Sequence, residues 1–159
     1  MRHPGIDAEL VAPLAEIKAL MPPLTLDGLR EIDAGALEMQ TSAQAIESYR
    51  GVIAAWAAGA LEVVMPGGLS GREFLDRYDE AVRALEDAGT RAVAVSHGAA
   101  IRTWLAARCP DVDPGMVSDR VLANTGIAVV EGSARTGWRL TGWLEEIPAD
   151  SPVRPPVNG

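Results

Sequence analysis

The stretch that most constrains the fold is "RAVAVSHGAAIRTWLAARC", residues 91–109. Residues 92–96 alternate small and β-branched side chains, a pattern typical of a buried strand. Gly98 permits a tight turn, and residues 99–108 consist largely of good helix formers. The segment therefore predicts a strand that leads directly into a helix, with His97 at the junction.

An ionisable ring at this junction is suited to binding an anion. Ligands of open α/β sheets bind beyond the carboxyl ends of the strands, and His97 is predicted to stand at such an end. The backbone N–H groups at the start of the helix carry partial positive charge, which favours an anion such as phosphate. The alternative is a structural histidine that fills the strand end and makes one backbone hydrogen bond.

Composition limits the class of partner and the compartment. The 159 residues suffice for one domain with a core. A net charge of −8 without a Lys/Arg cluster disfavours nucleic acid as a partner. The sequence has no long uncharged apolar run and no basic-then-apolar start, so we expect neither a membrane span nor a signal peptide. The single Cys109 cannot form an internal disulfide, which favours a reducing, cytoplasmic location.

Two capping boxes predict two further helices. Thr41 with Gln44 predicts a helix that runs to about residue 58 and stops at Gly59. Ser70 with Glu73 predicts a helix that continues to residue 89. One apolar face follows the second helix at helical spacing, formed by Phe74, Leu75, Tyr78, Ala81, Val82 and Leu85. Residues 7–20 also have helical composition, although Pro13 interrupts them.

The remaining elements lie near the end of the chain. "TGIAVVEG" and "WRLTGWLE" are strand-like, and "SARTG" between them predicts a hairpin. The Pro-rich residues 148–159 predict a flexible tail that follows a single domain over residues 1–147. Strands that alternate with helices, together with a late hairpin, predict an α/β sandwich with a mixed sheet.

Two other catalytic sites are excluded by the residues present. Ser96 in "AVSHG" is placed as in a nucleophile elbow, but a serine hydrolase of that fold needs a histidine later in the chain. No histidine follows His97. Two histidines and one cysteine have no metal-binding spacing, so we expect neither a metal nor a cofactor.

Taken together, "LREIDAGALE" (residues 29–38) and "VSHGAAIR" (residues 95–102) resemble the histidine phosphatase superfamily, the phosphoglycerate-mutase-like proteins. In that family a loop of the first kind and a strand ending in His-Gly face each other across a phosphate pocket. "PGGLSGREFLDRYDEAV" resembles the segment that opens a long helix of the family, and "LANTGIAVVE…GWRLTGW" resembles its closing hairpin. The resemblance extends from roughly Ala12 to Trp143.

This resemblance implies a fold, a reaction and roles for particular residues. The fold would be a three-layer α/β/α sandwich with a mixed, mostly parallel sheet. The reaction would be hydrolysis of a phosphomonoester through a phosphohistidine intermediate, with a small phosphorylated molecule or inorganic phosphate as ligand. His97 would help to hold the phosphoryl group, and Glu31 would be the general acid that protonates the leaving oxygen. Gly98, Ser96 and Asn124 would line the pocket.

The sequence departs from the family pattern at its start. The nucleophile of the family is a histidine in an "RHG" motif at the end of the first strand. "MRHPG" contains His3, but no apolar strand precedes it and Pro4 replaces the glycine. We therefore expect the chain to begin in mid-domain, without the first strand, the nucleophile and two arginines. Leu69 and Met39, at positions where the family carries glutamate and often glycine, suggest relaxed constraint on the site.

Two hypotheses follow for the function. The first is a phosphomonoester hydrolase of this superfamily, impaired by loss of the nucleophile segment. The second is a non-catalytic relative that binds a phosphorylated ligand or a protein partner. Without the first strand, residues 92–96 would present an unpaired apolar edge, so we also expect the chain to dimerise or aggregate.

Overall fold

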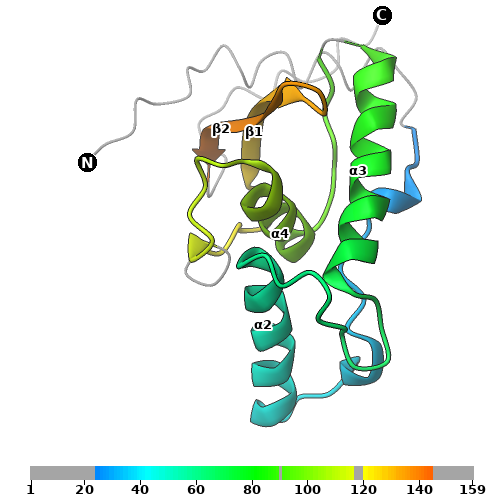
Figure 1. Cartoon of the computed structure of the whole chain (residues 1–159), viewed down its shortest axis with the longest axis vertical. Coiled ribbons are helices and arrows are strands. Elements are labelled where there is room, and N and C mark those ends of the chain that lie inside the picture. The colour runs from blue at the N-terminus through cyan, green and yellow to red at the C-terminus, as the bar shows by residue number, and fades with distance from the viewer. Residues whose placement is uncertain (1–23, 90, 117–119, 145–159) are drawn as a thin grey trace, which may run out of the picture.

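The computed structural model describes residues 24–89, 91–116 and 120–144, which form a mixed α/β structure (Figure 1). These described residues form three α-helices and then a hairpin: α2 (Ala43–Ala57), α3 (Gly71–Ala88), α4 (Gly98–Arg108), β1 (Ile127–Ser133) and β2 (Gly137–Leu144). Helix α4 contacts both α2 and β2. Two short 3-10 turns precede α2: Asp27–Leu29 packs against α3, and Gly35–Leu37 packs against α2.

The predicted hairpin is confirmed. Strands β1 and β2 pair antiparallel, from Ile127 opposite Leu144 to Ser133 opposite Gly137, with a bulge between Val129 and Val130. Within the described residues this two-stranded ladder is the regular sheet, accompanied by an isolated bridge at Val64 and Ser70. The mixed α/β class therefore holds, while the three-layer arrangement and the mostly parallel sheet stay predictions.

The prediction of a buried strand over residues 92–96 is wrong. This segment forms no strand ladder, and its valines are exposed, Val93 by 47% and Val95 by 88%. A strand is stabilised by hydrogen bonds to a neighbouring strand, and no strand in the described part of the chain runs beside this one. Three other predicted features lie outside the described residues: the helix over residues 7–20, the tail over residues 148–159 and His3.

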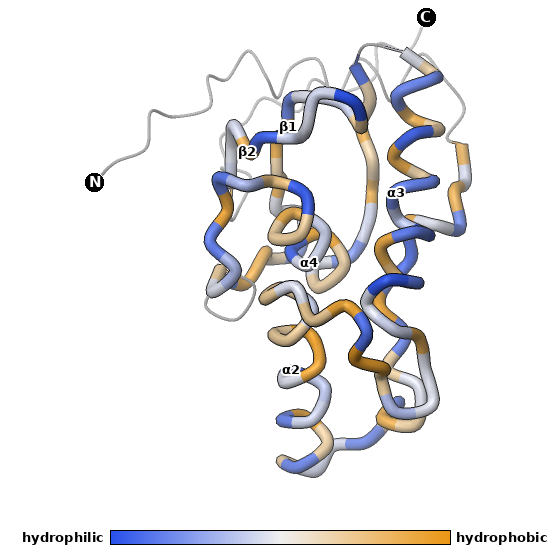
Figure 2. Tube along the Cα trace, viewed as in Figure 1, coloured by the Kyte–Doolittle hydropathy of each residue, from blue (hydrophilic) through white to orange (hydrophobic). Residues whose placement is uncertain are grey.

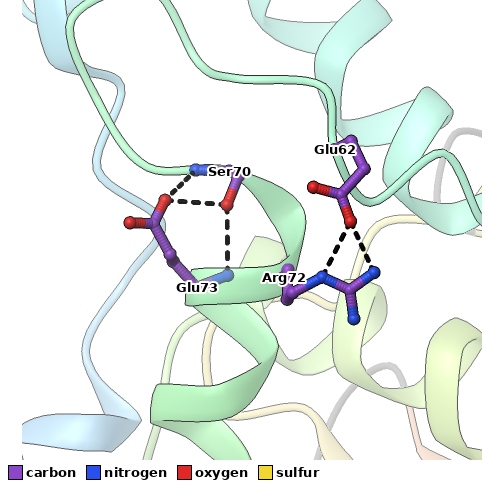
Figure 3. A network of polar contacts seen from close by, with 4 residues as sticks. All are labelled: Glu62, Ser70, Arg72 and Glu73. Atoms are coloured by element: carbon purple, nitrogen blue, oxygen red, sulfur yellow. Dashed lines mark hydrogen bonds and ion pairs between the residues drawn. The ribbon is translucent and has the colours of Figure 1, made fainter.

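Helix α3 begins as the sequence predicts, at a capping box (Figure 3). The Glu73 carboxylate accepts the backbone N–H of Ser70 at 2.8 Å, and the Ser70 hydroxyl accepts the N–H of Glu73 at 3.3 Å. The Glu73 carboxylate accepts from both the backbone N–H and the hydroxyl of Ser70, and these two hydrogen bonds hold the pKa of Glu73 below its usual value. The neighbouring ion pair of Arg72 with Glu62 is largely exposed and contributes little to stability. Gly89 ends the helix as expected.

Helix α2 begins one residue later than the predicted capping box. Its N-cap is Ser42 and not Thr41, because the Ser42 hydroxyl accepts the N–H of Ala45 at 3.2 Å. The third helical residue is then Ala45, so Gln44 is not in position to complete a capping box. The helix still ends where predicted, before Gly59, which has a φ of +92°.

An aromatic row joins the helices to the hairpin. Successive rings lie 5.7–5.9 Å apart between centroids, and the row runs from α2 through α3 and α4 to β2: Trp56, Phe74, Tyr78, Trp104 and Trp138. The predicted apolar face of α3 supplies two of these rings and is confirmed, since its first four members are buried. Figure 2 shows apolar and polar residues alternating along this helix. The row fixes α3 against α4, and these two helices support the site.

Two glycines of the helices predict opposite effects of adding one methyl group. In Gly71→Ala the new carbon would lie 2.7 Å from the ring of Trp56, which is 1% exposed, so the free energy of unfolding should fall by about 1–3 kcal/mol. In Gly51→Ala the methyl group meets nothing within 4 Å and removes a flexible residue from α2, so stability should rise by about 0.5–1 kcal/mol. Urea unfolding of both variants measures the difference. Equal effects of the two substitutions would contradict this packing.

Candidate functional site

Glu31 lies in a short loop that is anchored on both sides. The buried side chains of Leu29 and Ile32 flank it, 8% and 4% exposed. The preceding turn lies so close to α3 that a side chain on Gly28 would be 2.6 Å from the Arg77 carbonyl oxygen. Only glycine fits at this position, and the close approach sets where Glu31 emerges from the loop.

The Glu31 carboxylate lies at the N-terminus of α4. Its Oε1 accepts the backbone N–H of Ala100, in the first turn of that helix, at 2.9 Å. The same oxygen accepts the N–H of Ile32 at 3.0 Å. Because the first N–H groups of a helix have no partner within the helix, this position favours a negatively charged group. In this structure the negatively charged group is the side chain of Glu31.

His97 is the N-cap residue of the same helix. Its backbone is extended, its carbonyl accepts the N–H of Ile101 at 2.9 Å, and its side chain is exposed. Gly98 is the first residue of α4. The fold therefore brings Glu31 and His97 to one end of one helix, although Glu31 and Ala100 are 69 positions apart in the sequence.

Ser96 forms a second link between the Glu31 loop and the segment before α4. Its hydroxyl donates to the Leu29 carbonyl at 2.6 Å. Burial raises the pKa of Tyr78, and a hydrogen bond with Ser96 partly offsets this effect. Ser96 therefore serves here as a connection between backbone segments, and its predicted role in lining a phosphate pocket stays a prediction.

Asn124 is exposed and lies in the turn that precedes β1. The same region approaches the helix N-terminus at Leu122, whose carbonyl oxygen is 3.4 Å from the position of a Cβ on Gly98. The structure thus places the chain just before Asn124 beside α4. Contact of the Asn124 side chain itself with a ligand stays a prediction.

Tyr49 of α2 responds to the charges of this site. Burial, and after it the negative charge of Glu31, raises the pKa of Tyr49 to about 12, while the charge of Arg102 acts in the opposite direction. Arg102 lies on the first turns of α4, where its Nε donates to the Gly98 carbonyl at 3.0 Å. Its Nη1 donates to the Arg120 carbonyl at 2.5 Å. The Tyr49 hydroxyl and the Arg102 guanidinium therefore belong to the electrostatic surroundings of the Glu31 carboxylate.

Neither a cavity nor a metal cluster distinguishes another site in the described part of the chain. Two open hollows of about 380 and 340 Å³ lie at the hairpin and beside residues 26–28, and neither is lined by Glu31 or His97. Among residues 24–89, 91–116 and 120–144 no group of three potential ligands could hold a metal. Within the same ranges no helix is long and apolar enough to span a bilayer.

The sequence model of the Histidine phosphatase superfamily (branch 1) matches residues 8–146. The chain belongs to this superfamily. Searches among curated proteins and among solved structures found no match. Membership in the histidine phosphatase superfamily indicates phosphatase-type or mutase-type chemistry on phosphorylated substrates. The family resemblance read from the "LRE" loop and the His-Gly pair is thus confirmed.

Sequence reasoning missed three residues that lie around the Glu31 loop. Tyr49, Arg77 and Tyr78 approach the Glu31 loop from α2 and α3. Tyr78 was recognised only as a core residue, because its spacing fits the apolar face of α3. Arg77 lies in the segment that resembles the start of the family's long helix, but its contacts with backbone carbonyls could not be predicted from that resemblance. Tyr49 had no detectable signal either, because its effect depends on the placement of α2 beside the loop.

The closeness of Tyr49 to Glu31 predicts a measurable shift. A negative charge disfavours the phenolate, so removing it in Glu31→Gln should lower the pKa of Tyr49 from about 12. Titration of tyrosinate absorbance in a Tyr78→Phe background follows Tyr49 alone, since the sequence has two tyrosines. Glu131→Gln removes the same charge from the hairpin and serves as control. An unchanged Tyr49 titration in Glu31→Gln would show that the two side chains are not neighbours.

Proposed function

We propose that the N-terminus of α4 binds the phosphoryl group of a small phosphomonoester, and that the chain is a phosphomonoester hydrolase of its superfamily. The observation that carries this proposal is the hydrogen bond from the Ala100 N–H to the Glu31 carboxylate. It shows that an anion is accommodated at this helix end, beside the histidine that caps the helix.

The proposed reaction assigns one role to each side chain. Phosphoryl oxygens accept hydrogen bonds from the N–H groups of the first turn of α4 and from the His97 ring. In the family reaction a histidine nitrogen forms a bond to phosphorus while the bond from phosphorus to the leaving oxygen breaks. Glu31, in its protonated form, gives its proton to that leaving oxygen. Water then displaces phosphate from the histidine.

The carboxylate and the phosphoryl group compete for the same N–H groups. While Glu31 accepts from Ala100, that N–H is not available to a phosphoryl oxygen. Substrate binding therefore requires the Glu31 side chain to turn away from Ala100. The movement would place the carboxyl group beside the phosphoryl group, on the side where a leaving oxygen can receive its proton.

The second candidate function is binding without hydrolysis. Within residues 24–89, 91–116 and 120–144 His97 is the only histidine, whereas a phosphohistidine mechanism needs one histidine to attack and the family keeps a second in the pocket. The first candidate function is therefore a weakly active hydrolase, and the second is a chain that binds phosphate or a phosphorylated ligand without hydrolysing it. The net charge of −8 favours a small phosphorylated molecule over nucleic acid, and the single cysteine favours a cytoplasmic location.

Phosphate binding tests the proposed site. Titration with inorganic phosphate should move the NMR signals of the His97 ring, with an affinity no better than about millimolar, roughly 4 kcal/mol. Binding should weaken in His97→Ala, which loses a donor. It should strengthen in Glu31→Gln, because a neutral side chain competes less for the Ala100 N–H.

His3→Ala is the matched control, since it removes the other histidine of the sequence. Ring signals of His97 that stay fixed at tens of millimolar phosphate (about tenfold above the expected dissociation constant) would contradict the proposal. A loss of affinity in Glu31→Gln would contradict the competition between carboxylate and phosphate.

Hydrolysis distinguishes the two candidate functions. With p-nitrophenyl phosphate at mildly acidic pH, we expect little or no turnover by the 159-residue chain. Any turnover should be lost in both His97→Ala and Glu31→Gln. Robust turnover that disappears in His3→Ala would identify His3 as the nucleophile and would overturn our interpretation of "MRHPG".

A further inference from the structure

We propose that Arg77 of α3 is a positioning residue that sets the Glu31 carboxylate at the N-terminus of α4. This inference rests on the proposed role of Glu31 and adds a residue that acts through it. The hydrogen bonds of the Arg77 guanidinium go to the backbone that carries Glu31 and not to Ala100 or His97.

The guanidinium of Arg77 spans the Glu31 loop with both terminal nitrogens. Nη1 donates to the carbonyls of Asp27 at 3.2 Å, Gly28 at 3.1 Å and Arg30 at 3.2 Å. Nη2 donates to the carbonyls of Arg30 at 3.3 Å and Glu31 at 3.2 Å. Four carbonyls of one five-residue stretch therefore converge on one side chain. A planar guanidinium can make this set of contacts, whereas a lysine presents its donors from a single nitrogen.

Other contacts restrict where this guanidinium can lie. Its central carbon stands 5.4 Å from the centroid of the Phe74 ring, one turn earlier in α3. Within the described residues its Nε is buried without a hydrogen-bond partner. The side chain therefore leaves one donor unsatisfied while its terminal nitrogens bind the loop. Burial and the charge of Arg30 lower the pKa of Arg77, yet an arginine remains protonated over the working pH range. Arg77 therefore keeps its positive charge and all its donors throughout this pH range.

Glu31 is held at both of its ends. Its backbone carbonyl accepts from Arg77 on the α3 side, and its carboxylate accepts from Ala100 on the α4 side. The Ser96 hydroxyl secures the neighbouring Leu29 carbonyl. Without Arg77 the four carbonyls turn to water, and the remaining anchors of the loop, the buried Leu29 and Ile32 side chains and the Ser96 contact, do not fix the orientation of the Glu31 carboxylate. The carboxylate then spends little time at the Ala100 N–H.

A double-mutant cycle with an NMR readout tests this role. The chemical shift of the Ala100 amide depends on its hydrogen bond to the Glu31 carboxylate. The substitution Glu31→Gln in the otherwise unchanged chain should therefore change this chemical shift. Arg77→Met keeps the apolar stem and removes the donors, and in this background Glu31→Gln should leave the Ala100 signal nearly unchanged. Arg72→Met is the matched control, because it removes an arginine of the same helix whose partner is the exposed Glu62. In that background the shift should keep its full size.

An Ala100 shift of the same size in the Arg77→Met and Arg72→Met backgrounds would overturn the proposal. If Arg77→Met does not give a folded amide spectrum, Arg77→Lys replaces it. Lysine keeps the charge but cannot span four carbonyls, so the shift caused by Glu31→Gln should lose most of its size there as well. An unchanged shift in Arg77→Lys would show that positive charge alone suffices and that the fork of the guanidinium is not required.

The same variants separate this inference from the proposed function. Titrated with inorganic phosphate, the Arg77→Met chain should gain no affinity from Glu31→Gln, because its carboxylate has already left the Ala100 N–H. If phosphate leaves the NMR signals of the His97 ring unchanged, the result counts against the proposed function. The double-mutant cycle on the Ala100 amide signal is measured without phosphate. The cycle therefore tests Arg77 even if the site binds another anion.

Discussion

A carboxylate at the N-terminus of a helix is the interaction on which this site depends. The N–H groups of the first turn of α4 require partners, and Glu31 supplies one from a loop that precedes α2, α3 and α4 in the sequence. This single contact joins the Glu31 carboxylate to the helix that His97 caps. The proposed phosphoryl group would bind at the same place, because a phosphate oxygen satisfies the same donors.

The surrounding structure serves to keep that contact in place. The aromatic row fixes α3 against α4, and α3 in turn carries Arg77 to the loop. Gly28 allows the loop to approach α3, and the Ser96 hydroxyl ties the loop to the segment before α4. The site is therefore built between two packed helices, and its precision derives from backbone contacts more than from an enclosed cavity.

Local patterns in the sequence predicted the elements whose signals are themselves local. The capping box of Ser70 and Glu73 and the hairpin near the end of the chain are present as predicted. The N-cap of α2 was misplaced by one residue, since Thr41 and Ser42 are both good N-caps and only the geometry decides between them. The strand over residues 92–96 failed because a strand also needs a neighbour, which its own composition cannot supply. The pairing of Glu31 with the His97 end of α4 came from the family resemblance, whereas Arg77 belonged to the matched segment over residues 66–82 but was given no role in the site.

A crystal structure of the chain grown with orthovanadate, a phosphoryl analogue, tests whether the N-terminus of α4 binds the phosphoryl group. We expect vanadate oxygens within hydrogen-bond distance of the first N–H groups of α4 and of the His97 ring. We also expect that the Glu31 carboxylate has left the Ala100 N–H and lies beside the vanadate. A structure in which vanadate binds away from α4, while Glu31 still accepts from Ala100, would contradict the proposal.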